Sequence, residues 1–253
     1  MGLFAQLTES IPYVQSPVFA KGDIILDTPL SGYVPLLQLF TGAYATPQMF
    51  GAFADGQSHS LENVTTLCGI NTRGWTLAQW QEVFPNATSL TQEVDYLATD
   101  AALQRHDVVY CPAGTYRFGI DTLTLPGRDG VRLLGAGRNS TEWVTDSATA
   151  DVICFASTAQ SGQEVSYGSI YSTVAKTAGA GIKMTGGHSH RSQCMTFGSN
   201  MHTSYLLLAW TAQFNYFIYE PEINSGEYGI VLGDGTQASL PQNIWIIGGL
   251  IYN

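Results

Sequence analysis

Two acidic side chains on either side of a proline, Glu220 and Glu222, have the type and spacing that acid–base chemistry requires. Hydrolysis of a glycosidic bond needs two carboxyl groups, one of them protonated, about 5–10 Å apart on one surface. If Pro221 and Ile223 point inward, both glutamates point outward, and two strand residues separate them by about 6.6–7 Å. We therefore predict Glu220 and Glu222 as the catalytic pair, with ordinary solvated surface acids as the alternative interpretation.

Three residues that follow this pair are candidates for binding a saccharide. Glu227 and Asp234 lie in adjacent turns and extend the acidic patch, and Tyr228 offers an aromatic face that can stack on a sugar ring. An elimination reaction would instead need a base and a cation that neutralises a uronate, so hydrolysis, elimination and binding alone stay open. Tyr228 belongs to a late aromatic cluster that could equally fill a core, namely Tyr205, Trp210, Phe214, Tyr216, Phe217, Tyr219, Tyr228 and Trp245.

Other residues that could bind a metal or a cofactor lack the further ligands or motif residues that such a site needs. His188 and His190 share one face of an extended segment, but no third Cys, Asp or Glu ligand is close, so we expect polar loop residues. The four cysteines are far apart and form no Cys-x-x-Cys pair. Gly135-Ala-Gly137 lacks the rest of a dinucleotide fingerprint and is expected to be a turn. We predict no metal and no cofactor.

The composition excludes several classes of function. The chain has 253 residues with 10 basic and 20 acidic side chains, a net charge of -10, which disfavours binding to nucleic acid or to an anionic membrane. No apolar run is long enough to span a bilayer, and Met1 to Glu9 lacks the pattern of a signal peptide. Charged residues make up only 12%, and 27 residues are glycine. This composition argues against a helical protein and favours a folded β-rich chain or part of an assembly.

The periodicity predicts two helices and then many short strands. Helices are expected at 75–84, ended by Pro85, and at 91–104, after hydroxyl N-cap candidates at 89 and 91. Hairpin turn signals are missing between the later apolar runs, so these runs can stack in parallel only if the chain coils around an axis. We therefore predict an all-β solenoid. The runs are 108–111, 122–125, 131–134, 151–155, 181–184, 193–197, 205–208, 215–218, 222–223, 229–232 and 243–247.

Five stretches of sequence resemble the pectate-lyase-like right-handed parallel β-helix superfamily, as found in phage tailspikes and polysaccharide depolymerases. They are TPQMFGAFADG (46–56), TDAALQ (99–104), VVYCPAGTYR (108–117), LTLP (123–126) and VRLLGAG (131–137). Later segments, 221–232 and 243–252, are similar to rungs of such solenoids. The resemblance covers about Pro47 to Asn253, and departs from the usual pattern after Gly56, where about 35 residues are inserted.

The resemblance implies three regions and a function. Residues 1–48 would form an extended virion-anchor or trimerisation segment, 49–106 a helical cap, and 107–253 a parallel β-helix that is incomplete at its C-terminus. It implies a homotrimeric tailspike or tail fibre on the virion that contacts other tail or baseplate proteins. Such a protein would bind or degrade a host surface polysaccharide. A stand-alone, extracellular bacterial polysaccharide lyase or glycoside hydrolase and a structural tail adaptor without glycan chemistry are the alternatives.

Overall fold

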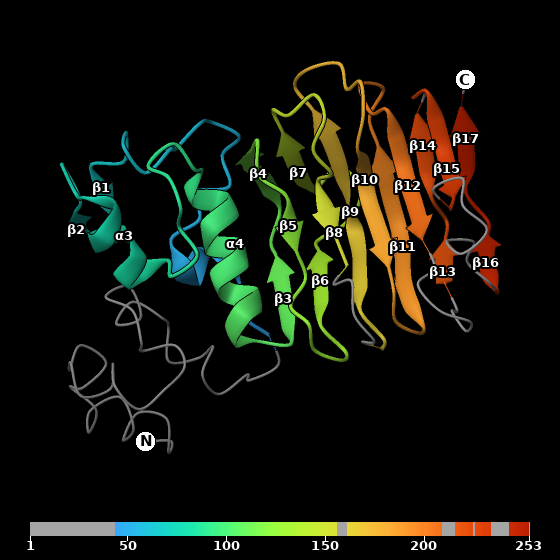
Figure 1. Ribbon diagram of the computed structural model, residues 1–253, viewed down its shortest axis with the longest axis horizontal. Coiled ribbons are helices and arrows are strands. Elements are labelled where there is room, and N and C mark those ends of the chain that lie inside the picture. Colours follow the sequence, from blue (N-terminus) through green and yellow to red (C-terminus); the bar gives the residue numbers. More distant parts are fainter. Residues whose placement is uncertain (1–43, 156–160, 209–215, 225, 234–242, 253) are drawn as a thin grey trace, which may run out of the picture.

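The computed structural model describes residues 44–155, 161–208, 216–224, 226–233 and 243–252. Most of these residues form parallel strands that stack into a solenoid, with two helices at its N-terminal end (Figure 1). The predicted all-β solenoid with a helical cap is confirmed. Of the segment predicted as an anchor, residues 1–43 lie outside the described residues.

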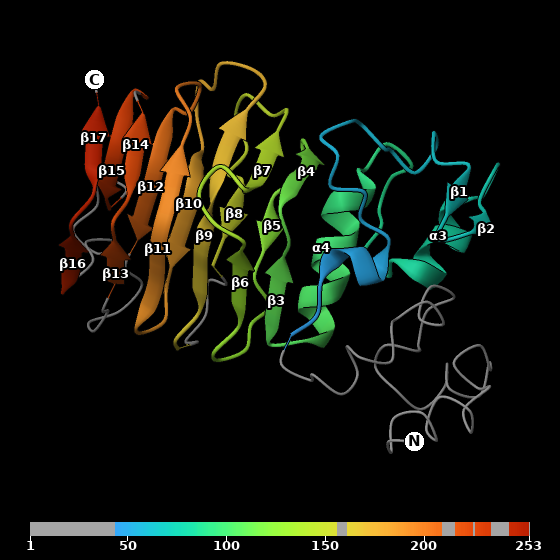
Figure 2. The same ribbon diagram turned by 180° about the vertical axis from the view of Figure 1, so that it is seen from behind.

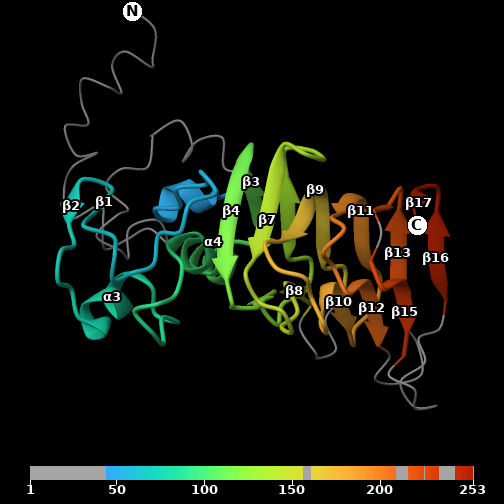
Figure 3. The ribbon, with the colours of Figure 1, turned by 90° about the horizontal axis from the view of Figure 1, so that it is seen from above.

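Each turn of the solenoid contributes to two sheets that lie around a common axis (Figures 2 and 3). Val108, Arg132, Glu164 and Arg191 are equivalent in successive turns, so a turn takes 24 to 32 residues. The five-stranded sheet consists of β5 (Leu123–Thr124), β8 (Ile153–Cys154), β10 (Ala180–Thr185), β12 (Thr203–Leu208) and β15 (Tyr228–Leu232). The ten-stranded sheet consists of β3 (Val108–Cys111), β4 (Gly114–Gly119), β6 (Arg132–Gly135), β7 (Thr141–Thr145), β9 (Glu164–Ser172), β11 (His190–Phe197), β13 (Tyr216–Tyr219), β14 (Glu222–Asn224), β16 (Ile244–Ile247) and β17 (Leu250–Tyr252).

The core lies inside the coil because side chains alternate between its two faces. In β7, Trp143 is buried, whereas Glu142 and Val144 point outward and stay half-buried. Inward residues then stack on the equivalent residues of the next turn, as Ile153 and Ile182 do in the five-stranded sheet. Each such fully buried side chain contributes roughly 1.5–3 kcal/mol, so parallel register and hydrophobic burial stabilise the same arrangement.

The ten-stranded sheet bends at one column of residues with left-handed backbone conformation. Tyr167, Cys194, Glu220 and Gly248 have φ angles of 62°, 51°, 48° and 69°, and the strand register on both sides places them opposite one another. A residue in this region interrupts the extended strand and redirects the residues that follow it. The column, called the corner here, divides the outer surface of the sheet into two halves.

The second turn replaces the tight corner with a short loop. Gly135 occupies the corner position, where a Cβ atom would lie 2.1 Å from the carbonyl oxygen of Tyr167, so only glycine fits. Residues 136–140 then leave the sheet before β7 begins, and Asn139 adopts a φ of 57°. The backbone N–H of Asn139 donates to Ser169 Oγ at 2.9 Å. The loop 136–140 therefore folds over the outer face of β9.

Two helices and a short 3-10 turn close the N-terminal end. They are α3 (Leu77–Val83), α4 (Val94–Arg105) and η5 (Pro47–Phe50), and a two-stranded antiparallel ribbon, β1 (Thr66–Leu67) and β2 (Ile70–Asn71), precedes α3. Helix α4 packs against η5, β3, β4 and β5, as expected of a cap. Its N-cap is Glu93, not the predicted hydroxyl at 89 or 91, since the helix begins only at Val94. The Glu93 carboxylate makes no capping hydrogen bond and instead accepts from Ser58 Oγ and the His59 N–H. Among the described residues, no helix is long and apolar enough to cross a membrane.

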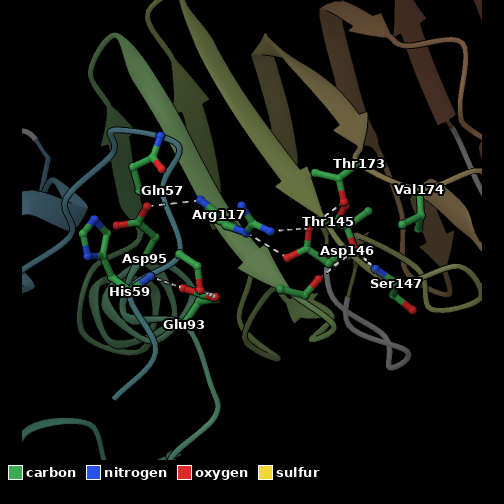
Figure 4. Close-up of polar contacts among 12 residues, drawn as sticks. Gln57, His59, Glu93, Asp95, Arg117, Thr145, Asp146, Ser147, Thr173 and Val174 are labelled. Carbon is green, nitrogen blue, oxygen red and sulfur yellow. Dashed lines mark hydrogen bonds and ion pairs between the residues drawn. The ribbon is translucent and has the colours of Figure 1, made fainter. Parts of the chain in front are cut away.

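Charged side chains fasten α4 to the first turn of the solenoid. The buried Asp95 carboxylate accepts backbone N–H groups from Phe53 at 2.7 Å and from Arg117 at 3.1 Å (Figure 4). Arg128 donates to the carbonyl groups of Leu103 and Gln104 at the end of the helix, both at 2.9 Å. Backbone groups that would be unpaired at a solenoid end and at a helix end are thus satisfied by ionic side chains.

Candidate functional site

The structure places the predicted catalytic pair at and beside the corner. Pro221 and Ile223 are buried as expected, and Glu222 points outward from β14. Glu220, however, is the exposed corner residue with a φ of 48°, and its carboxylate lies 3.5 Å from Cys194 Sγ. The spacing of 6.6–7 Å assumed an extended strand through both residues, so it does not describe the actual pair.

The predicted substrate-binding residues lie at a different place on the solenoid. Glu227 Oε2 is 3.2 Å from Nε2 of His202, and the Tyr228 ring contacts the same imidazole edge to face at 5.2 Å. Tyr228 is the first residue of β15 in the five-stranded sheet and Glu227 directly precedes it, whereas Glu222 belongs to the ten-stranded sheet. Among the described residues, no hydrogen bond or ion pair links Glu227 or Tyr228 to Glu220 or Glu222. Asp234 lies outside the described residues.

The late aromatic residues and histidines divide between the core and the surface. Tyr205 and Tyr216 are fully buried, whereas Phe217 and Tyr219 lie on the outer face with their rings nearly parallel, 6.3 Å apart. Trp245 is exposed, and Trp210 and Phe214 lie outside the described residues. The expectation of a polar loop is wrong for His190, because this residue begins β11 and is completely buried.

The structure assembles a polar cluster around Glu222 that the sequence alone does not reveal. We call it the Arg138 cluster, and its members are Arg138, Asn139, Glu142, Tyr171 and Glu222. Cross-strand register connects Glu142 through Ser169 and Thr196 to Glu222, so the two glutamates occupy equivalent outward positions three turns apart. Tyr171 points outward from β9 between them, and Arg138 and Asn139 come from the loop 136–140.

Hydrogen bonds hold the members of the Arg138 cluster on the outer face. The Tyr171 hydroxyl donates to Asn139 Oδ1 at 3.1 Å, and Thr196 Oγ1 donates to Glu222 Oε2 at 3.3 Å. Arg138 Nη1 lies 4.0 Å from the same carboxylate oxygen. Glu142 accepts a hydrogen bond of 2.9 Å from Thr115 Oγ1 of the preceding turn. The cluster therefore joins residues that are up to 84 positions apart in the sequence.

Electrostatics couples the two glutamates to the phenol between them. Burial raises the pKa of Tyr171, and the negative charges of Glu142 and Glu222 raise it further, against the opposite effect of its hydrogen bond with Ser169. The phenol therefore stays neutral at physiological pH and can both donate and accept a hydrogen bond.

Arg138 keeps unused hydrogen-bonding capacity, unlike the comparable arginine at the cap. Its Nε and Nη2 are shielded from solvent, and neither has a hydrogen-bond acceptor among the described residues. In contrast, the same two nitrogens of Arg117 bind the Asp146 carboxylate at 2.8 and 2.9 Å, and Thr173 Oγ1 donates to that carboxylate at 2.6 Å (Figure 4). The contacts around Arg117 fasten neighbouring turns, whereas Arg138 Nη1 is 4.0 Å from the Glu222 carboxylate and both side chains stay partly exposed, at 31% and 27%. It is this exposed part of the cluster that a ligand could reach.

Comparison with known proteins identifies no relative: no protein-family model, curated protein or solved structure matches the chain significantly. Within the described part of the chain, no three His, Cys, Asp or Glu side chains gather in a way that could hold a metal ion. The Arg138 cluster consists of a guanidinium, an amide, a phenol and two carboxylates, and these groups define the chemistry that it can perform.

Proposed function

We propose that this chain binds polysaccharide on the outer face of its β-solenoid, as a tail-associated receptor-binding protein of a phage, and that the Arg138 cluster contacts the glycan. The observation that carries the proposal is the outward position of this cluster, whose Arg138 and Glu222 side chains are partly exposed and whose two carboxylates accept few hydrogen bonds from the described residues. Sugar hydroxyl groups both donate and accept hydrogen bonds, and carboxylate, amide, phenol and guanidinium groups complement them. The parallel rings of Phe217 and Tyr219, across the corner, offer a further surface on which a sugar can stack.

Attachment to a virion is the second part of this proposal. It is supported by the resemblance of the sequence to phage tailspikes, in which the segment before the solenoid joins the tail. Residues 1–48 would have that role here, in a homotrimer located at the phage tail. The proposal predicts that the full chain elutes as a trimer and that removal of residues 1–43 abolishes its binding to tail or baseplate proteins while leaving glycan binding intact. A monomeric full chain without affinity for any tail protein would refute this part.

Glycan binding can be tested on an array of bacterial surface polysaccharides with the full-length chain. We expect Arg138→Ala and Tyr171→Phe each to weaken binding of the best ligand by about ten-fold, the effect of one or two lost hydrogen bonds to a charged or polar group. Arg73→Ala is the matched control, because Arg73 is an exposed arginine of the cap and lies away from both proposed contact surfaces of the solenoid. Equal affinities of all four proteins would refute the role of the cluster, and no binding at all would favour a structural adaptor.

Polysaccharide cleavage is a second candidate function, in which Glu222, partly exposed beside Arg138 and Thr196, would act as the acid or the base. Glu142 is three turns away, about 14 Å by the spacing of neighbouring strands, and is too distant to complete a hydrolytic pair with it. Reducing ends would report hydrolysis, and absorbance of an unsaturated product would report elimination. We expect Glu222→Gln to abolish any cleavage, because Glu222 belongs to the cluster, and Glu220→Gln to leave it nearly unchanged. If both variants retained full activity, the reaction would have to occur elsewhere on the chain.

A further inference from the structure

The Arg138 cluster has more negative than positive charge at its surface. Glu142 and Glu222 contribute two carboxylates, and Arg138 contributes the only guanidinium, which already lies 4.0 Å from Glu222. The residues between the two glutamates in the same column, Ser169 and Thr196, are neutral. The nearby guanidinium of Arg117 is neutralised by Asp146. A ligand on this face therefore meets a net negative charge.

Both carboxylates have acceptor positions that the protein does not use. Among the described residues, Glu142 accepts one hydrogen bond, from Thr115, and Glu222 accepts two weak ones, from Thr196 at 3.3 Å and Asn224 at 3.4 Å. An ionised carboxylate offers about four acceptor positions on two oxygens. Two adjacent hydroxyl groups of a sugar can each donate a hydrogen bond to one carboxylate, and they therefore fit these free acceptor positions.

We infer that the Arg138 cluster takes a neutral saccharide with adjacent hydroxyl groups and discriminates against saccharides that carry a carboxylate, sulfate or phosphate. This inference rests on the proposed glycan-binding function and names its ligand class. Sugar hydroxyls donate to Glu142 and Glu222, and Tyr171 and Arg138 donate to sugar oxygens. An anionic substituent would instead lie beside two like charges, which costs affinity. The net charge of -10 adds a repulsion that slows the approach of anionic polymers.

A matched pair of polysaccharides tests the inference on the full-length chain. The probe is the neutral polysaccharide that binds best on the array, together with its derivative in which primary alcohols are oxidised to carboxylates. At low ionic strength we expect the oxidised form to bind roughly five-fold more weakly, as one like-charge pair about 4 Å apart in a water-like dielectric predicts. In 0.5 M salt the difference should shrink, because screening shortens the range of the repulsion.

The double variant Glu142→Gln/Glu222→Gln separates the local charge from the charge of the whole protein. We expect it to narrow the difference between the two probes to about two-fold. The control Glu62→Gln/Glu82→Gln removes the same charge from exposed positions of the cap and should leave the difference unchanged. Tighter binding of the oxidised probe, array binding confined to acidic polysaccharides, or no effect of the double variant would overturn the inference while the proposed function stands. If no polysaccharide bound, both would fail.

Discussion

The buried histidine of the core gives the most direct prediction about stability. His190 has no exposed surface and lies between the rings of Phe155, 5.0 Å away, and Tyr216, 5.9 Å away. The pKa of His190 is lowered from 6.5 to about 4, mainly because the imidazole is buried, and the charge of nearby His188 acts in the same direction. The folded protein therefore holds a neutral imidazole where an unfolded chain would protonate.

The sign and size of the pH effect follow from these two pKa values. Above pH 6.5 the imidazole is neutral in both states, and His190 has no pH-dependent effect on stability. As pH falls from 6.5 to about 4, His190 becomes protonated in the unfolded chain but stays neutral in the folded protein, so the free energy of unfolding decreases. Since one pKa unit corresponds to about 1.4 kcal/mol, the loss at pH 4.5 is about 2 to 3 kcal/mol.

Urea unfolding of the wild type and of His190→Leu, at pH 8 and pH 4.5, measures this effect. Leucine occupies a similar volume and does not titrate, so other ionisable groups contribute equally to both proteins and cancel in the comparison. We expect the wild type to lose about 2 to 3 kcal/mol more than the variant between the two pH values. If the two proteins lost the same free energy of unfolding, within about 0.5 kcal/mol, His190 would not be the buried neutral group described here.

Three substitutions test the contacts that shape the solenoid. Gly135→Ala should cost at least 3 kcal/mol or prevent folding, since its Cβ would meet the Tyr167 carbonyl oxygen. Gly229→Ala is the control: its Cβ would meet no atom closer than 3.6 Å, and alanine loses less backbone entropy than glycine in a strand, so this variant should be unchanged or up to about 1 kcal/mol more stable. Equal melting temperatures of the two variants would show that the corner is not tight. Asp95→Asn should lower the free energy of unfolding by about 2 kcal/mol, because an amide accepts fewer of the hydrogen bonds from the Phe53 and Arg117 N–H groups. Hydrogen exchange of these two backbone amides should become faster. Unchanged exchange rates would contradict the role of Asp95 as a cap. Arg128→Met removes the hydrogen bonds to the Leu103 and Gln104 carbonyl groups, so the end of α4 should fray and the free energy of unfolding in urea should fall by about 1 to 3 kcal/mol. An unaltered urea midpoint would show that water replaces these hydrogen bonds.

Local patterns in the sequence predicted much of the fold. Short apolar runs without hairpin turns predicted parallel stacking, and the burial of Pro221 and Ile223 agrees with the orientation assumed for this strand. The strand β9 was missed, because Ser166, Gly168 and Ser169 interrupt its apolar pattern. In a solenoid these small residues are acceptable, since neighbouring turns on both sides pair with the strand and cover it.

The candidate site was predicted only in part. Glu222 was selected from strand parity, and the structure places it in the Arg138 cluster. Its assumed partner Glu220 is a corner residue, and left-handed conformation at a glutamate is rare enough that sequence parity gives no warning of it. Whether either glutamate acts in catalysis stays a prediction, as do the roles of Tyr228, Glu227 and Asp234.

The sequence by itself determined that the chain coils into stacked parallel turns, because hydrophobic alternation and turn residues act over a few neighbouring positions. Only the tertiary structure decided which residues meet across turns. Turn length varies from 24 to 32 residues, so the strand register depends on where each turn pairs with the turn before it. This register places Arg138 and Glu142 on the same outer surface as Glu222. That closure depends on backbone pairing and on corner geometry at positions such as Gly135, which no local pattern of side chains specifies.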